Sequence, residues 1–81
     1  MVINTMVKAF IMVKAGSGEA EALSNAIGTL NHVTEVNVVA GDFDLIVEAE
    51  ADAVYDVINA AATEIRGLAD VDDTKTYVCL E

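Results

Sequence analysis

Two carboxylates and a glycine stand between two apolar runs near the middle of the chain. Asp42 and Asp44 follow Gly41, and the apolar runs span residues 36–40 and 45–49. Apolar, β-branched runs on both sides of a Gly/Asp cluster predict two strands joined by a tight hairpin. The hairpin tip would expose both carboxylates, and either of them could accept a hydrogen bond from a ligand ammonium group. Asp and Gly are also ordinary turn residues, so the local sequence leaves a purely structural role open.

Two threonines form a second candidate feature near the start of the last predicted strand. Thr74 and Thr76 are two residues apart, so a strand places them on one face. Their hydroxyl groups could bind a carboxylate or a carbonyl oxygen. Threonine is also a common strand residue, so this pattern alone does not assign a ligand role.

The sequence offers little for catalysis or metal binding. It contains one histidine, His32, and one cysteine, Cys79. A metal site needs several convergent ligands, and a disulfide within the chain needs a second cysteine. No nucleophile-elbow, phosphate-loop or dinucleotide-binding motif occurs, and nothing pairs a nucleophile with a base. We therefore expect no enzymatic activity, no metal and no cofactor.

Composition limits the classes of partner. The 81 residues are 54% hydrophobic, which predicts one domain with a small core that gains stability by homo-oligomerisation. Fourteen acidic and four basic residues give a net charge of −10. Such a surface repels nucleic acid and anionic lipid, so we expect no direct contact with either. The acidity favours solubility or adaptation to a salty cytoplasm, as in a halophile. Without a membrane span or a signal peptide, the sequence predicts a cytoplasmic protein.

Hydrophobic periodicity predicts the order strand, helix, strand, strand, helix, strand. The predicted elements are strands at 6–14, 33–40, 44–50 and 74–80, a helix at 18–30 after an N-cap at Ser17, and a helix between an N-cap at Asp52 and a stop at Gly67. The apolar stripes expected to face the core are Ala20, Leu23, Ile27 and Leu30 in the first helix, and Val54, Val57, Ile58, Ala61 and Ile65 in the second.

This order predicts an α+β fold of the ferredoxin-like βαββαβ type. Right-handed crossovers place both helices on one face of a four-stranded antiparallel sheet. The other face would carry Phe10, Met12 and Ile46, an exposed apolar patch in a monomer. Patches of this kind mark association surfaces, so the fold itself predicts a homodimer.

Two motifs carry a resemblance to a known family. The hairpin at 39–47 contains a Gly-x-x-Asp turn that leads into an apolar strand, and the segment at 71–78 opens with Val-x-x-Thr-x-Thr. With the βαββαβ order they resemble the effector-binding domain of the Lrp/AsnC transcriptional regulators, also called the RAM domain, from about Met6 to Leu80. The resemblance implies dimers that pack through their open sheet faces and assemble into rings, commonly octamers or decamers. It also implies an amino-acid effector bound between dimers beside the turn. Carried over by motif, the ligand-binding residues would be Gly41, Asp42, Phe43 and Asp44, with Thr74 and Thr76 as further candidates.

The resemblance also shapes the expected output. The predicted elements use residues 1–81 as one ligand-binding domain, which leaves no helix-turn-helix DNA-binding domain. The chain would then act indirectly on transcription or amino-acid metabolism, by sensing amino acids or by mixing with full-length Lrp/AsnC relatives. Two alternatives share the fold order: a small enzyme built as a dimeric ferredoxin-like barrel, and an ACT-like regulatory domain that pairs its sheets side by side.

Overall fold

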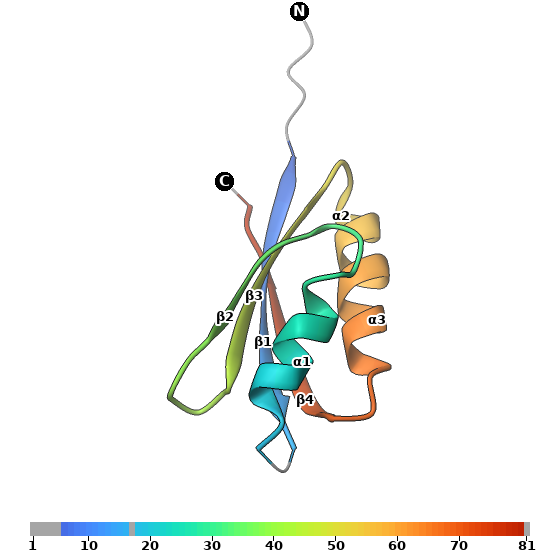
Figure 1. The fold of residues 1–81 in the computed structure, drawn as a ribbon. Helices are drawn as coiled ribbons and strands as arrows, with labels where there is room; N and C mark the ends of the chain where they lie inside the picture. The colour runs from blue at the N-terminus through green and yellow to red at the C-terminus, as the bar shows by residue number, and fades with distance from the viewer. Residues whose placement is uncertain (1–5, 17, 81) are drawn as a thin grey trace, which may run out of the picture.

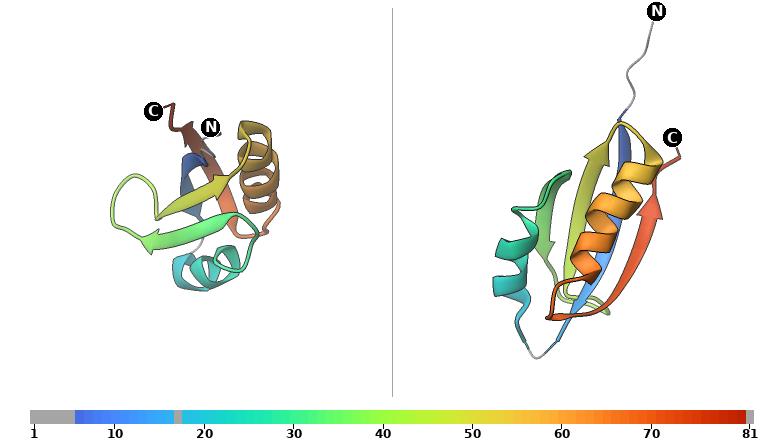
Figure 2. Two further views of the ribbon diagram at one scale, coloured as in Figure 1. Left: turned by 90° about the horizontal axis from the view of Figure 1, so that it is seen from above. Right: turned by 90° about the vertical axis from the view of Figure 1, so that its right-hand side faces the viewer.

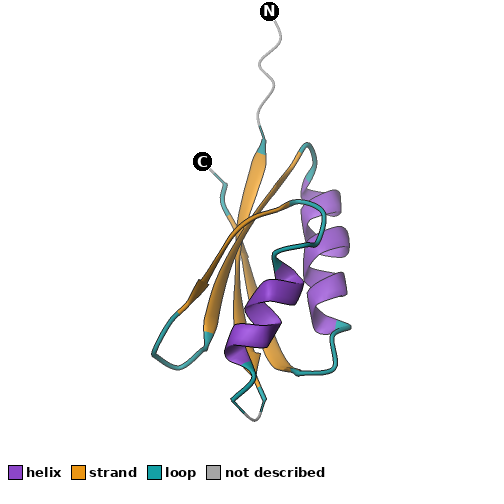
Figure 3. Ribbon diagram, in the orientation of Figure 1, coloured by secondary structure: helices purple, strands orange, loops and turns teal. Residues whose placement is uncertain are grey.

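The computed structural model describes residues 6–16 and 18–80, and for Ala60 and Ala61 only the backbone. The strands are β1 (Val7–Ala15), β2 (Val33–Val38), β3 (Leu45–Ala51) and β4 (Val71–Val78). Helix α1 (Ala20–Ile27) follows β1, and a second helical segment follows β3. That segment consists of α2 (Val54–Asp56), the π-helix η1 (Val57–Ala62) and α3 (Thr63–Arg66) (Figure 1, Figure 3).

The four strands form one antiparallel sheet in the order β2-β3-β1-β4. The two central strands, β1 and β3, come from different halves of the chain. Both helical segments cover the same face of this sheet, as the side view in Figure 2 shows. The predicted ferredoxin-like βαββαβ fold is confirmed.

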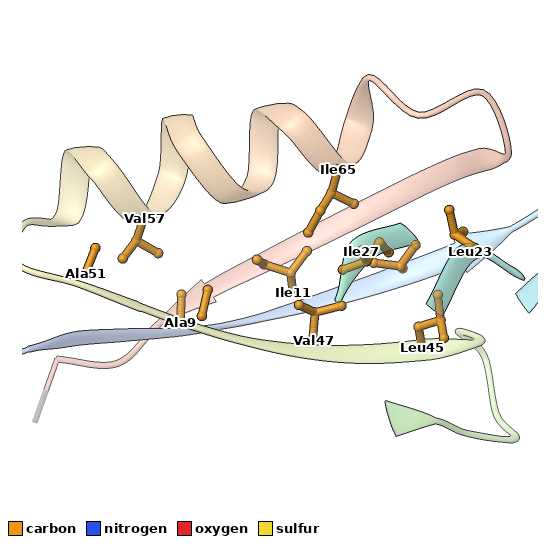
Figure 4. Packing of buried hydrophobic residues seen from close by; sticks show 11 residues of the cluster. Ala9, Ile11, Leu23, Ile27, Leu45, Val47, Ala51, Val57 and Ile65 are labelled. Atoms are coloured by element: carbon orange, nitrogen blue, oxygen red, sulfur yellow. The ribbon is translucent and has the colours of Figure 1, made fainter. Parts of the chain in front are cut away.

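The core lies between the sheet and the helices. On β1, Ala9, Ile11 and Val13 are fully buried, and every second residue of β3 from Leu45 to Ala51 faces the same side. Leu23 and Ile27 of α1 complete the contact (Figure 4). Burying one branched aliphatic side chain stabilises the fold by about 1.5–3 kcal/mol. Because these buried side chains all lie on one face of the sheet, that face is the one the helices cover.

The helix-free face of the sheet carries the other set of alternating residues. Phe10 and Met12 of β1 and Ile46 of β3 are half-buried there, as the sequence predicts. Tyr77, directly opposite Phe10 on β4, remains 52% exposed. We call these four residues the open apolar face. It lacks a covering layer within the described chain.

The second helical segment differs from the predicted amphipathic stripe. Val57 and Ile65 are fully buried as expected, but Ile58 is 41% and Val54 46% exposed, and Ala62 is buried. The π-turn explains the shift, because a helix with i→i+5 hydrogen bonds places a residue five positions after Val57 on the same face. The side chain of the predicted Ala61 lies outside the described residues.

The predicted element ends also shift by a few residues. The predicted N-cap at Asp52 is wrong: Ala53 holds that position with an extended backbone and without a side-chain hydrogen bond. Helix α1 ends at Ile27 rather than Leu30. The N–H groups of Thr29 and Leu30 donate to carbonyl oxygens three residues earlier, so the chain forms a turn there. Strand β4 begins at Val71, three residues before the predicted start, because it pairs with the end of β1. The predicted N-cap at Ser17 lies outside the described residues.

Candidate ligand-binding site

The turn between β2 and β3 is anchored on the end of β1 by three consecutive residues. The N–H of Asp44 donates to the carbonyl oxygen of Val13 at 2.9 Å, and the N–H of Ala15 donates to Oδ2 of Asp44 at 2.8 Å. Between them, Nζ of Lys14 donates to the carbonyl oxygen of Asp42 at 2.9 Å. These contacts join residues far apart in the sequence and hold the hairpin tip against the central strand.

The two carboxylates of the turn therefore differ in role. Asp44 is half-buried, and its carboxylate accepts a hydrogen bond from the backbone N–H of Ala15. This contact gives Asp44 a structural role within the chain. Asp42 is exposed, and among the described residues its carboxylate makes no hydrogen bond or ion pair. Of the two carboxylates, that of Asp42 is therefore the one available to accept a hydrogen bond from a ligand ammonium group.

Gly41 and Phe43 complete the predicted segment. Gly41 is exposed, its φ lies outside the left-handed region, and a Cβ added to it would meet no atom within 4 Å. The fold of the chain itself therefore does not require a glycine at this position. Phe43 is half-buried, and the turn is closed by the N–H of Val39 donating to the carbonyl oxygen of Asp44 at 2.8 Å. The result is a short, closed tip with open space above Gly41.

The predicted threonines lie on the other side of β1. Thr74 pairs with Val13 and Thr76 with Ile11, so both threonines face the helix-covered side and are half-buried. Strand β1 separates them from β3, and neighbouring strands lie about 4.8 Å apart, which puts the threonine strand roughly 10 Å from the turn. The fold brings Thr74 to the same end of the sheet as Asp44 but does not join the turn and the threonines into one pocket.

The end of the sheet that carries the turn is acidic. A β-bulge between Lys14 and Ala15 shifts the pairing with β4, so that Asp73 lies opposite Lys14 and Val71 opposite Ala15. The extra residue, Asp72, lies over Gly16, where a Cβ would come within 2.9 Å of its carboxylate. A larger residue at position 16 would therefore require the exposed Asp72 side chain to move aside, whereas at Gly41 nothing lies within 4 Å.

A half-open groove of about 640 Å³ lies at the opposite end of β1. It is lined by Met6, Val7, Lys8, Phe10, Val54, Cys79 and Leu80. The positively charged residue of this groove, Lys8, already forms ion pairs: its Nζ lies 3.4 Å from Glu48 and 3.8 Å from Glu50. Hydrogen bonding to Glu48 and the charges of Glu48 and Glu50 raise the pKa of the Lys8 ammonium above its ordinary value of 10.5. Mainly apolar walls and a neutralised cation suit a zwitterionic amino acid poorly.

The described residues contain no group of three or more side chains arranged to hold a metal ion. Within the same residues, no helix combines the length and the apolar character needed to cross a membrane.

Comparison with known proteins decides the family. The family model described as "Lrp/AsnC ligand binding domain" matches residues 8–81, which is nearly the whole chain. The chain belongs to the Lrp/AsnC ligand-binding domain family. Among curated proteins, none matches the sequence.

Solved structures share the fold of this domain. A protein from Thermus thermophilus is 27% identical, with a TM-score of 0.85, and the match covers 93% of this chain and 94% of that one. A hypothetical protein from Pyrococcus horikoshii is 28% identical, with a TM-score of 0.83 and coverage of 93% and 90%. A transcriptional regulator from Neisseria meningitidis, solved as a complex with L-methionine, shares the fold at 17% identity and a TM-score of 0.78. The match covers 93% of this chain and 50% of the regulator.

Sequence reasoning missed the contact between Lys14 and the candidate turn. The signal available was the charge of Lys14: it is one of only four basic residues, and it ends the apolar run of the first strand. Its contact with Asp42 depends on strand pairing across 28 positions, which no local pattern reports.

Proposed function

We propose that this Lrp/AsnC domain is an amino-acid sensor without catalytic activity, which binds its effector at the Gly41–Asp44 turn within a homo-oligomer. Membership of a ligand-binding domain family supports the proposal. The main observation is the turn itself: it exposes the Asp42 carboxylate, which has no partner among the described residues, on a backbone that is hydrogen-bonded to the central strand β1. A preorganised acceptor of this kind loses little entropy when a ligand binds.

The Asp42 carboxylate would accept hydrogen bonds from the effector's ammonium group. Asp44 would support the site by fixing the turn on β1, and the open space above Gly41 would admit the ligand backbone. Phe43 would supply apolar contact. Because β1 separates Thr74 and Thr76 from the turn within one chain, they would contribute only from a second subunit whose strand approaches the turn.

The oligomer would begin with a homodimer formed through the open apolar face. Phe10, Met12, Ile46 and Tyr77 form a layer that a second copy would cover, and a domain of 81 residues gains stability from such burial. Dimers would assemble into a ring of eight or ten subunits, with effector sites at the contacts between dimers. The output would be indirect control of transcription or amino-acid metabolism, alone or in mixed assemblies with full-length relatives.

Isothermal titration with each of the twenty amino acids tests the sensing function. The titration is run in concentrated salt to keep the acidic chain compact. At least one amino acid should give saturable heat. Asp42→Asn should weaken that binding about 10- to 100-fold, because a charge-assisted hydrogen bond contributes about 1.5–3 kcal/mol. Asp56→Asn, an exposed change of the same charge on α2, should leave binding unaltered. Absence of heat with all twenty would refute amino-acid sensing.

Gly41→Ala provides a steric probe of the same site. The added methyl group meets no atom of its own subunit, so the free energy of unfolding should not change. Binding should weaken if an effector or a second subunit approaches this backbone. Unchanged binding would place the effector away from Gly41.

A further inference from the structure

The Lys14 ammonium group lies next to the turn, and among the described residues it forms no ion pair with a carboxylate. Lys14 is exposed, and its Nζ donates to the Asp42 carbonyl oxygen at 2.9 Å. The ion pairs among the described residues both involve Lys8. An ammonium group has three donors, so the backbone contact leaves two of them available.

The groups around Lys14 form a mixed pattern of charge. The exposed Asp42 carboxylate belongs to the turn residue that Lys14 contacts, and Asp73 lies directly opposite Lys14 on β4. The Asp73 carboxylate accepts a hydrogen bond from the N–H of Thr74 at 2.9 Å. At this end of the sheet, the Lys14 ammonium group is therefore surrounded by the carboxylate-bearing residues Asp42 and Asp73.

We propose that Lys14 is a specificity-determining residue that binds the α-carboxylate of the effector while Asp42 accepts hydrogen bonds from its α-ammonium group. This inference rests on the proposed amino-acid sensing function. It assigns the donor for the carboxylate to a side chain that already fixes the turn, so binding requires little rearrangement. The ligand class is a zwitterion with a free carboxylate.

The same charges select against acidic side chains. An effector with a second carboxylate would meet Asp42, Asp44 and Asp73 with one cation to share among its anionic groups. Like charges at short range lower affinity. Neutral and basic amino acids should therefore bind more tightly than aspartate or glutamate.

Ligand pairs separate this role from a merely structural one. Each amino acid that binds the wild-type oligomer is titrated beside its α-carboxamide, which keeps the ammonium group and the side chain but lacks the negative charge. The variants are Lys14→Met, which removes the ammonium group, and Lys14→Arg, which keeps a cation. Arg66→Met is the matched control, because it removes an exposed positive charge at the end of α3.

Lys14→Met should weaken binding of the amino acid about 10- to 100-fold, the range expected for a lost charge-assisted hydrogen bond. It should change binding of the carboxamide by less than about threefold, and Lys14→Arg should restore most of the lost affinity. Arg66→Met should bind both ligands as the wild type does.

Three results would overturn the proposal, and they have different meanings. If the wild type binds no amino acid, the sensing function fails and the role of Lys14 fails with it. If the wild type binds but Lys14→Met binds equally well, only the role of Lys14 fails. If Lys14→Met weakens amino acid and carboxamide equally, Lys14 acts by holding the turn and not by binding the carboxylate.

Discussion

The backbone N–H of Ala15 donates a 2.8 Å hydrogen bond to Oδ2 of Asp44, which joins the last residue of β1 to the end of the β2–β3 turn. This contact gives a conspicuous acidic residue of the sequence a structural role. It also separates the two carboxylates of the turn into a support, Asp44, and an exposed acceptor, Asp42.

Asp44→Ala should lower the free energy of unfolding by about 1–3 kcal/mol, because it leaves the part-buried N–H of Ala15 without its acceptor. Asp44→Asn keeps a side-chain oxygen and should cost less. Chemical denaturation followed by circular dichroism measures both. Asp42→Ala is the control and should stay within about 0.5 kcal/mol of the wild type. Equal effects of Asp42→Ala and Asp44→Ala would contradict the division of roles.

The π-turn predicts that two isoleucines of the second helical segment contribute unequally. Ile65→Ala should cost about 2–5 kcal/mol, because Ile65 is fully buried and its truncation leaves a cavity. Ile58→Ala should cost less than about 1 kcal/mol, since Ile58 lies on the outer side of the segment. Denaturation of both variants at one protein concentration compares them. Equal losses would favour the regular amphipathic stripe over the π-turn.

Phe10→Lys should dissociate the proposed dimer without unfolding the subunit. Phe10 lies opposite Glu48 on β3, so a lysine there finds a carboxylate in the monomer but would be buried in a packed interface. Light scattering should then report the 8.5 kDa monomer instead of an oligomer. Tyr55→Lys, at a 72% exposed position of α2, is the control and should keep the wild-type mass. If Phe10→Lys also keeps that mass, the open apolar face is not the dimer interface.

Lys8 should make stability depend on pH at the alkaline end. Its pKa is raised above 10.5 in the folded chain by Glu48 and Glu50, so the folded state holds the proton more tightly than the unfolded state does. The stabilisation is fully present below 10.5 and is lost as the pH rises through the higher folded value. Unfolding midpoints of the wild type should therefore fall above that pH. Lys8→Met should show a smaller fall, and an equal fall would assign the effect to other groups.

Salt dependence should separate the two interpretations of the acidic composition. With a net charge of −10, self-repulsion is screened as salt is added, and the Debye length is already about 10 Å at 0.1 M. Ordinary screening should raise the unfolding temperature and then level off by about 1 M salt. Adaptation to a salty cytoplasm predicts a continued rise above that concentration. A thermal denaturation series in potassium chloride distinguishes them, and stability that is independent of salt would support neither.

The sequence by itself determined the order of elements and the location of the turn. These follow from local patterns: apolar spacing distinguishes the strands from the helices, and Gly41 with the two aspartates marks the turn. The family motifs also lie within single segments of the chain. For this reason the ferredoxin-like fold and the Lrp/AsnC family were both predictable from the order of the residues.

Only the tertiary structure decided how the candidate residues relate to one another. The roles of Lys14 and Asp44 depend on the docking of the turn against β1, and the separation of Thr74 from the turn depends on β1 lying between them. The π-turn, which buries Ala62 in place of Ile58, depends on packing against the sheet. Local periodicity cannot report such contacts, because they join residues far apart in the sequence and are set by strand order and close packing.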